Sequence, residues 1–534
     1  MRKINKLTIT SFCLGALLAT SGCTKDFVDI NTNPLTSPAK EFDPNFVFTS
    51  AQLNYTGSTD FAYDTWRGNL IYSGTMMQGL STVISYWAGD KYILNQDYTT
   101  AYWGTTAVGA YIEQVRFIVD VVESTKGLPH YANLHNAARI WKAVIFARLT
   151  DLYGDVPYSE AGLGYYEKIF RVKYDKQQDI YNSLLKEVDE ASAALTTTGD
   201  VIKGDVIYKG DIAKWKMFAN SFMLRLAMRL VKVDDAKAKE YAQKAIGKTL
   251  ASNADNAIVK HDRSGARVTQ NRNSQVLLGD GGQENYYVKW SNTFINFLKT
   301  TNDPRLGKVA VTKLWLTDAA KDEKGQNPDF NATPAVQKGM PNGKDLGTNP
   351  LYAISSDPSY TSFLDYSSPH PAMITRDGPT FILTYAETEF LLAEAAVRWG
   401  IGGSAQDHYN NAIKGALTNL GQYSDALNVS DADVATYLAA NPFKPAEALK
   451  QINYQYWAHT ITLLDFYETW SNWKRTGYPT LTPVVYPGNA TNGTIPRRFP
   501  YPVSEAAVNG EFYKQASAAV PGGDLLSGRV WWDK

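Results

Sequence analysis

The stretch YANLHNAARIWKAVIFARLTD, residues 131–151, determines the expected fold class. Its apolar residues recur at intervals of three or four positions, the spacing of one face of an α-helix. That face consists of Leu134, Ala138, Trp141, Ile145 and Leu149. We expect Gly154 to end this helix, because glycine readily adopts the C-terminal cap conformation, and Pro157 to prevent its continuation.

Helical periodicity continues along the chain beyond this segment. Asp175, with Gln178 three residues later, predicts a capping box before a buried stripe that runs from Tyr181 to Leu195. Asp211 predicts another cap, before a helix over 212–230 whose Trp215, Phe218, Phe222 and Leu226 share one face. Further amphipathic helices are expected near 104–124, 236–249, 380–399, 405–420 and 445–472.

Strand signals are few, and most Gly, Pro and Asn residues gather in long stretches that predict loops at 250–292, 317–378 and 474–534. Helix pairs separated by turns favour tetratricopeptide-like hairpins stacked side by side, although no clean 34-residue repeat is present. The expected fold class is mostly α: a tetratricopeptide-like helix-pair scaffold with a large irregular, loop-rich portion that would bind the ligand.

Composition excludes several classes of protein. The chain has 534 residues, of which 44% are hydrophobic and 13% aromatic, so most of it can fold around a sizeable core. Its 53 basic and 53 acidic side chains argue against binding nucleic acid through phosphate neutralisation. Both cysteines, Cys13 and Cys23, stand near the N-terminus, so the body has no disulfide, cysteine zinc site or thiol nucleophile.

The first 22 residues read as a secretory signal peptide. Arg2, Lys3 and Lys6 precede a mostly apolar run from Leu7 to Thr20, which is shorter than the roughly 20 residues of a membrane span. Small residues then lead to Cys23, as in a bacterial lipobox, where the cysteine becomes the acylated N-terminus. An ordinary signal peptide with a stray cysteine is the alternative. Cleavage would leave a net charge of −3, and residues 23–45 read as a lipid-anchored extended leader.

Some charged pairs invite a catalytic interpretation. Glu387 and Glu394 share a helix face at about the separation used in inverting glycoside hydrolysis. Their helix also carries an apolar stripe, so we interpret both as members of scaffold ion pairs. Arg225 and Arg229 lie one turn apart and are expected to pair with acidic groups such as Glu394, with an anionic ligand as the alternative.

Eight segments in order resemble the SusD/RagB family of Bacteroidetes outer-membrane nutrient-binding lipoproteins. They are DLYGDVPYSEA (151–161), YDKQQDIYNSLLKEVDEA (174–191), GDIAKWKMFANSFMLRLAMR (210–229), NDPRL (302–306), TYAETEFLLAEAAVRWG (384–400), ETWSNWKRTGYPTL (468–481), PRRFPYPVSE (496–505) and VWWD (530–533). The resemblance implies one SusD/RagB-like helical domain over 46–534, with about four tetratricopeptide-type helix pairs. It also implies a surface lipoprotein, anchored at Cys23, that acts as the lid of a SusC-like TonB-dependent transporter.

Aromatic residues interleaved with polar ones indicate where a sugar could bind, because aromatic planes pack against its C–H faces and polar side chains reach its hydroxyl groups. The two best matches are SYWAGDKYILNQDYTTAYW (85–103) and QENYYVKW (283–290). The predicted ligand residues are Tyr86, Trp87, Tyr92, Asn95, Tyr98, Tyr286, Tyr287 and Trp290. Packing of the same side chains within loops, or a short strand at 283–290, is the alternative.

No catalytic residue, metal ligand or cofactor is predicted. The six histidines are scattered, and the sequence has no HExxH motif, phosphate-binding glycine loop or GxSxG motif. The predicted function is capture of an oligomeric nutrient, a glycan, for delivery to the transporter at the outer membrane. A peptide as cargo is one alternative, and a helical surface glycoside hydrolase or lyase is another.

Overall fold

The computed structural model describes residues 42–60, 63–105 and 107–534, so the signal peptide, Cys23 and most of the predicted leader lie outside the described residues. Residues Asn45–Lys534 form one compact unit, and all that follows concerns it. Helix α3 begins at Pro44, within the segment 23–45 that we expected to be extended.

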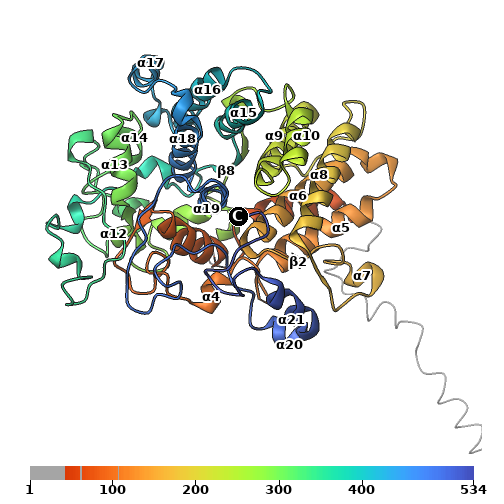
Figure 1. Ribbon diagram of the computed structural model, residues 1–534, viewed down its shortest axis with the longest axis horizontal. Helices are drawn as coiled ribbons and strands as arrows, with labels where there is room; N and C mark the ends of the chain where they lie inside the picture. Colours follow the sequence, from red (N-terminus) through yellow and green to blue (C-terminus); the bar gives the residue numbers. More distant parts are fainter. Residues whose placement is uncertain (1–41, 61–62, 106) are drawn as a thin grey trace, which may run out of the picture. The chain divides into compact units, whose positions relative to one another are not determined.

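The described chain is mostly helical, as predicted (Figure 1). The α-helices are α3 (Pro44–Tyr55), α4 (Gln96–Thr99), α5 (Arg116–Thr125), α6 (Ala132–Tyr153), α7 (Gly164–Glu167), α8 (Gln177–Ala194), α9 (Ile212–Arg229), α10 (Asp235–Ala245), α11 (Arg272–Leu277), α12 (Glu284–Tyr287), α13 (Asn292–Thr300), α14 (Leu306–Val309), α15 (Tyr385–Trp399), α16 (Ala405–Thr418), α17 (Asp431–Ala440), α18 (Ala448–Thr462), α19 (Phe466–Thr476), α20 (Glu505–Val508) and α21 (Gly510–Ala519). Two π-helical segments, η1 (Thr65–Gly74) and η2 (Tyr111–Val115), accompany them.

Strands are short and form antiparallel pairs. The strands are β1 (Leu80–Ser81), β2 (Val156–Pro157), β3 (Tyr174–Asp175), β4 (Ala257–Val259), β5 (Lys289–Trp290), β6 (Ala310–Val311), β7 (Ser368–Pro369) and β8 (Thr380–Leu383). They pair as β1–β5, β2–β3, β4–β8 and β6–β7. The pairs β1–β5, β4–β8 and β6–β7 join segments that are distant in the sequence, whereas β2–β3 joins segments that are close to each other in the sequence, after α6.

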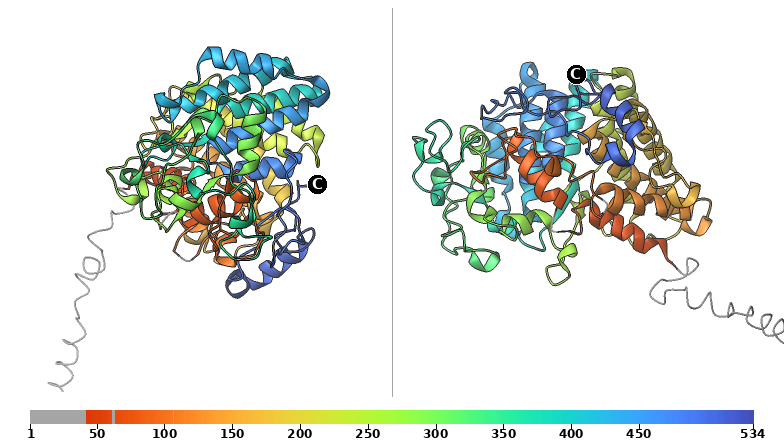
Figure 2. Two further views of the ribbon diagram at one scale, coloured as in Figure 1. Left: turned by 90° about the vertical axis from the view of Figure 1, so that its left-hand side faces the viewer. Right: turned by 90° about the horizontal axis from the view of Figure 1, so that it is seen from below.

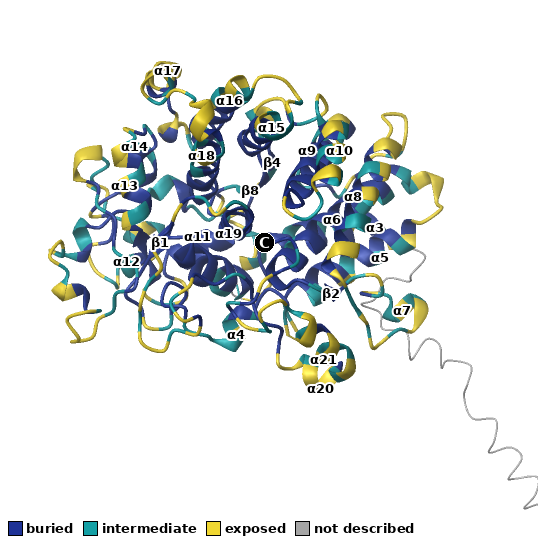
Figure 3. Cartoon of the chain, viewed as in Figure 1, coloured by how far each residue is buried: buried dark blue, intermediate teal, exposed yellow. Residues whose placement is uncertain are grey.

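Helices that follow one another along the chain pack side by side. α5 packs on α6, α6 on α8, α8 on α9 and α9 on α10, while α15 packs on α16 and α18, and α18 on α19. Figure 2 shows the same succession from two further sides. The stacked helix-pair arrangement is the predicted one, and the inner faces of these helices are the buried ones in Figure 3.

Helix α6 confirms the face predicted from 131–151. Leu134, Trp141 and Leu149 are fully buried on that face, together with Ala138 and Ile145. The helix ends at Gly154, which has φ 88° and donates its backbone N–H to Thr150 O at 2.8 Å. A residue with a Cβ would be strained at this φ, so glycine ends the helix as expected.

Several predicted boundaries were wrong for identifiable reasons. The stretch 445–472 holds two helices, because Leu464 adopts φ 57° and Asp465 then caps α19 by accepting from Glu468 N. Residues 380–383 form β8, and Thr384 caps α15. Asp175 does not cap α8; its carboxylate accepts from the backbone N–H groups of Tyr158 and Ser159.

The predicted loops contain short elements, including β4, α11 and α12 in 250–292 and α20 and α21 in 474–534. The segment from 317 to 378 is irregular as expected, apart from β7 and short 3-10 segments. Asp211 does cap α9, since its side chain accepts from Lys214 N.

Candidate functional site

Three of the predicted ligand residues are part of the core. Trp87 and Trp290 are fully buried and Tyr92 is 1% exposed. Their polar atoms are engaged within the protein: Trp290 Nε1 donates to Val309 O at 2.8 Å, and the Tyr92 hydroxyl accepts from Val484 N at 3.1 Å. Because no ring face is open to a ligand, the structure corrects the prediction for Trp87, Tyr92 and Trp290.

Asn95 has a local structural role. Its side chain accepts from Tyr98 N at 3.3 Å, which caps α4, and its backbone N–H donates to the Tyr72 hydroxyl at 2.8 Å. The side chain is half-buried. Asn95 therefore sets where α4 begins and places Tyr98.

The other four predicted aromatics are half-buried and lie in two neighbouring groups, Tyr86 with Tyr98 and Tyr286 with Tyr287. The structure adds Tyr63 and Trp66 beside the first group. Trp66 meets Tyr86 edge to face at 6.1 Å between ring centroids. Together we call Tyr63, Trp66, Tyr86, Tyr98, Tyr286 and Tyr287 the aromatic surface.

A cation holds one part of this surface together. The Arg67 guanidinium lies 3.7 Å from the centroid of the Tyr63 ring and 4.9 Å from that of the Tyr98 ring. Such contacts contribute about 0.5–1 kcal/mol each at exposed sites and more where water is excluded. Arg67 thus links the start of η1 to α4.

Glu284 joins the two groups. Its fully buried carboxylate accepts from the Tyr86 hydroxyl at 2.6 Å and from Trp87 Nε1 at 3.4 Å, and Glu284 is the first residue of α12, which also carries Tyr286 and Tyr287. Burial, followed by the hydrogen bond to Glu284, raises the pKa of Tyr86 well above 10, so its hydroxyl stays protonated. A Cβ on Gly282 would stand 2.9 Å from the Tyr86 hydroxyl oxygen, so glycine permits this close approach.

Tyr286 and Tyr287 stand on a second, smaller core. Their rings are perpendicular at 4.8 Å, and both contact Phe363, at 5.8 and 5.0 Å. Beneath them Phe363 belongs to a buried cluster with Val83, Met340, Ile354 and Tyr366. Packing from below fixes the two rings and leaves part of each accessible, as a stacking platform requires.

Sequence reasoning missed Tyr63, Trp66 and Arg67. The segment YDTWR (63–67) carries an aromatic and a basic residue four apart, a spacing that brings them together on one helix face. The same mixture of aromatic and polar residues that singled out 85–103 is present there, in a shorter stretch.

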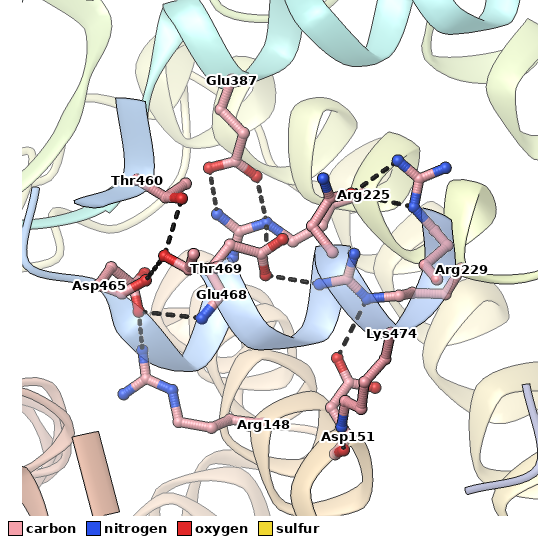
Figure 4. Close-up of polar contacts among 12 residues, drawn as sticks. Arg148, Asp151, Arg225, Arg229, Glu387, Thr460, Asp465, Glu468, Thr469 and Lys474 are labelled. Carbon is pink, nitrogen blue, oxygen red and sulfur yellow. Dashed lines mark hydrogen bonds and ion pairs between the residues drawn. The ribbon is translucent and has the colours of Figure 1, made fainter. Parts of the chain in front are cut away.

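The carboxylates considered for catalysis lie in the interior and are paired with arginines. Glu387 accepts from Arg225 at 2.5 and 2.6 Å (Figure 4). Glu394 accepts from Arg475 at 2.6 and 2.8 Å and from Arg398 at 2.7 Å. Both are scaffold ion-pair members, as interpreted from the sequence. Neither is placed to act on a glycosidic bond.

Arg225 and Arg229 pair with acidic groups, as expected, but Glu394, the example given for such a partner, is wrong. Arg229 donates to Glu468 at 2.6 Å and to Asp151 at 3.3 Å, while Glu394 belongs to Arg475. Glu468 lies in α19, and the apolar periodicity of the sequence predicted α18 and α19 as one helix. The position of Glu468 beside α9 could therefore not be predicted from the sequence. Desolvation alone would raise the pKa of Glu394, but Arg475 and Arg398 hold it at about 2.

Lys474 gives this interior a specific pH dependence. Burial lowers its pKa from 10.5 to about 7. Between pH 7 and pH 10.5 the unfolded state therefore binds one more proton than the folded state. In this range the contribution of Lys474 to the free energy of unfolding rises with pH, by about 1.4 kcal/mol per pH unit.

Lys474→Met lacks this contribution. We therefore expect its free energy of unfolding, relative to that of the unsubstituted protein, to fall between pH 7 and pH 9, as measured by urea titration. A difference that does not change with pH would contradict this.

Within the described chain, no group of three or more His, Cys, Asp or Glu side chains is arranged to hold a metal ion. Among its helices, none combines the length and apolar character that crossing a bilayer requires.

A family model described as "Starch-binding associating with outer membrane" (SusD-like) matches residues 40–502. The chain belongs to this SusD-like family, as its sequence motifs predicted.

Solved structures agree with this assignment. A chitin-binding protein is 33% identical, with a TM-score of 0.78, and the match covers 92% of this chain and all of that one. A Bacteroidetes SusD-like protein is 25% identical over the same shares, with a TM-score of 0.79. A chitin-binding SusD homologue from Flavobacterium johnsoniae, 23% identical over 92% of this chain and 98% of its own, has a TM-score of 0.72 and shares the fold. No curated protein matches the sequence.

Proposed function

We propose that this protein captures an oligomeric glycan at the outer surface of the outer membrane. The observation that carries the proposal is the aromatic surface, where partly exposed rings from η1, the 86–98 segment and α12 are held by Arg67, Glu284 and Phe363. Fixed rings bind a flexible sugar chain with a small loss of side-chain entropy. The names of the family and of two relatives, starch-binding and chitin-binding, support a glycan as ligand.

Polar groups beside the rings suit the hydroxyl groups of a sugar. Gln283 is exposed next to α12, where its Nε2 donates to Asp318 Oδ2 at 2.7 Å. Asp97 is exposed next to Tyr98. The rings can pack against the C–H faces of a sugar, and the amide and carboxylate groups beside them can form hydrogen bonds with its hydroxyl groups.

The same proposal includes a lipid anchor in the outer membrane and a partner transporter. Acylation at Cys23 anchors it to the membrane, and a SusC-like TonB-dependent transporter receives the cargo while this protein acts as its lid. Family membership and the sequence of residues 1–23 support both parts. A Cys23→Ser protein should lose its membrane attachment, as judged by cell fractionation, and purification of the native protein should bring a barrel transporter with it. Retention of Cys23→Ser at the surface would contradict the anchor.

The aromatic surface can be tested by alanine substitution. Tyr86→Ala, Tyr286→Ala and Tyr287→Ala should each weaken glycan binding by about 1–2 kcal/mol, roughly 5–30-fold in Kd. Affinity would be measured by isothermal titration calorimetry with starch- and chitin-derived oligosaccharides chosen from a glycan array. Tyr165→Ala is the matched control, because Tyr165 lies in α7, is 76% exposed and belongs to no part of the aromatic surface.

Two other functions make different predictions in the same assays. A peptide-capturing protein would bind immobilised peptides and fail to bind the array, since tyrosine platforms also pack on peptide side chains. A hydrolase or lyase would release new reducing ends from a bound glycan. Either result would replace the proposed function.

A further inference from the structure

A cleft of about 630 Å³ opens beside α4 and is distinct from the aromatic surface, apart from Tyr63, which lines it. Its walls come from residues 96–105 and 111–112, from 157–172 and from 502–508, so three distant parts of the chain form it. In Figure 1 the labels α4, β2 and α20 mark these segments. The volume lies within the range of about 300–1,000 Å³ that is usual for small-molecule sites.

The walls combine apolar side chains with acidic ones. Trp103 and Tyr111 form an aromatic wall, with ring centroids 4.9 Å apart, and Val172 and Pro502 add aliphatic surface. Trp103 is 6% exposed and is fixed from behind by Tyr153 and Tyr501, at 5.3 and 5.9 Å. The part of this wall that lines the cleft is the surface of electron-rich rings, held in place by the rings packed behind it.

The charges in the cleft have one sign. Asp97 and Glu505 line it, and among its lining residues in the described chain there is no Lys, Arg or His. Glu505 accepts from the Tyr174 hydroxyl at 2.7 Å, and burial raises the pKa of its carboxyl above 4.5. A carboxylate that is partly removed from water without a cation is stabilised when a cation arrives.

The donor inventory of an ammonium group suits this cleft. An ammonium group has three donors and no acceptor, so it matches a wall that offers two carboxylates, Asp97 and Glu505. Aromatic walls add cation–π attraction.

We propose that this cleft binds the ammonium group of an amino sugar, a unit with a free amine within or at the end of the captured glycan. The amine pairs with Glu505 and Asp97, and the carbon skeleton packs on Trp103 and Tyr111. A sugar is favoured over a lysine side chain because the cleft begins where the aromatic surface ends: Gln96 and Asp97 directly precede Tyr98 in the chain, and Tyr63 lines the cleft while its ring also contacts Arg67. This inference rests on the proposed function and adds a charge preference to it.

The test compares hexasaccharides that share the same β-1,4-linked backbone and differ only in the substituent at C2 of each sugar. Calorimetry at about pH 6 would use the β-1,4-linked hexamers of glucosamine, N-acetylglucosamine and glucose. The glucosamine hexamer should bind about ten-fold more tightly than the glucose hexamer, as expected for one additional charge-assisted hydrogen bond. Glu505→Gln should remove this preference, because glutamine still accepts from Tyr174 but carries no charge to pair with an ammonium group.

Glu511→Gln is the matched control, since Glu511 is exposed on α21 and does not line the cleft. Equal affinity for the glucosamine and N-acetylglucosamine hexamers would overturn the proposal, and so would Glu505-dependent binding of a lysine hexapeptide as tight as that of the glucosamine hexamer. Ligand-observed NMR with the monomers glucosamine and glucose tests the cleft alone. If the protein prefers glucosamine over glucose as monomers but binds no neutral hexamer, the proposed glycan-capture function is wrong and the ammonium site in the cleft is supported. If neutral hexamers bind but no preference for the amine is found, glycan capture is supported and the ammonium site is wrong.

Discussion

Arg475→Met should lower the free energy of unfolding by about 3–5 kcal/mol. Arg475 is 1% exposed and donates to both oxygens of Glu394, which is fully buried. Without the guanidinium, Glu394 keeps Arg398 as its remaining cation and loses its bidentate partner. The carboxyl must then either stay charged in a medium that solvates it poorly or take up a proton.

Urea unfolding followed by circular dichroism would measure this loss. Arg263→Met is the control: Arg263 also forms a bidentate pair, with Asp377, but its side chain is 49% exposed. Solvent screens such a pair, so its loss should change the free energy of unfolding by at most about 1 kcal/mol. Equal losses in the free energy of unfolding for Arg475→Met and Arg263→Met would contradict the prediction, because they would show that burial of the Arg475–Glu394 pair does not increase the cost of removing the guanidinium.

Trp87→Ala should destabilise the fold by about 3–5 kcal/mol, the usual range for removing a buried tryptophan from a core. Trp87 has no exposed surface, and its Nε1 donates to Glu284, so the substitution leaves both a cavity and a carboxylate oxygen with one fewer donor. Its neighbour Tyr86 is half-buried and shares the same acceptor. The two adjacent aromatics should therefore behave in opposite ways.

For Trp87→Ala we expect a large fall in the urea midpoint. For Tyr86→Ala we expect a smaller fall, because the ring is only half-buried although its hydroxyl also donates to Glu284, and a clear loss of glycan affinity. Both proteins would be assayed by urea titration and, at a temperature where each remains folded, by calorimetry with the same oligosaccharide. A Trp87→Ala protein of normal stability that binds no glycan would restore the original prediction that Trp87 is a ligand platform.

Helical periodicity was sufficient to predict the scaffold, because burial of one helix face leaves a spacing of three and four residues in the sequence. The face of α6 with Trp141 at its centre is the clearest case. The ends of the helices were harder to predict from the sequence. The break between α18 and α19 depends on one residue with positive φ, Leu464, and the apolar pattern continues on both sides of it without interruption.

The candidate site was predictable as a region but not residue by residue. Trp87 and Tyr86 are adjacent in the chain and have similar character, yet one is buried and the other partly exposed. Which ring points inward depends on the backbone of an irregular segment, where no period of two or 3.6 applies. Likewise, Glu284 appeared in the sequence as one polar residue in an aromatic run, and its role in holding Tyr86 follows from a contact across 198 positions.

Residues 532 and 533 close the interior beside α6. Trp532 is fully buried and donates Nε1 to Asp151 in the last turn of α6, and Asp533 forms an ion pair with Arg497. The contact between Trp532 and Asp151 spans 381 positions of the sequence. A contact of such range forms late, because the entropy of closing the intervening loop is lost before the contact is gained. We therefore expect Trp532 to become buried in a late step of refolding.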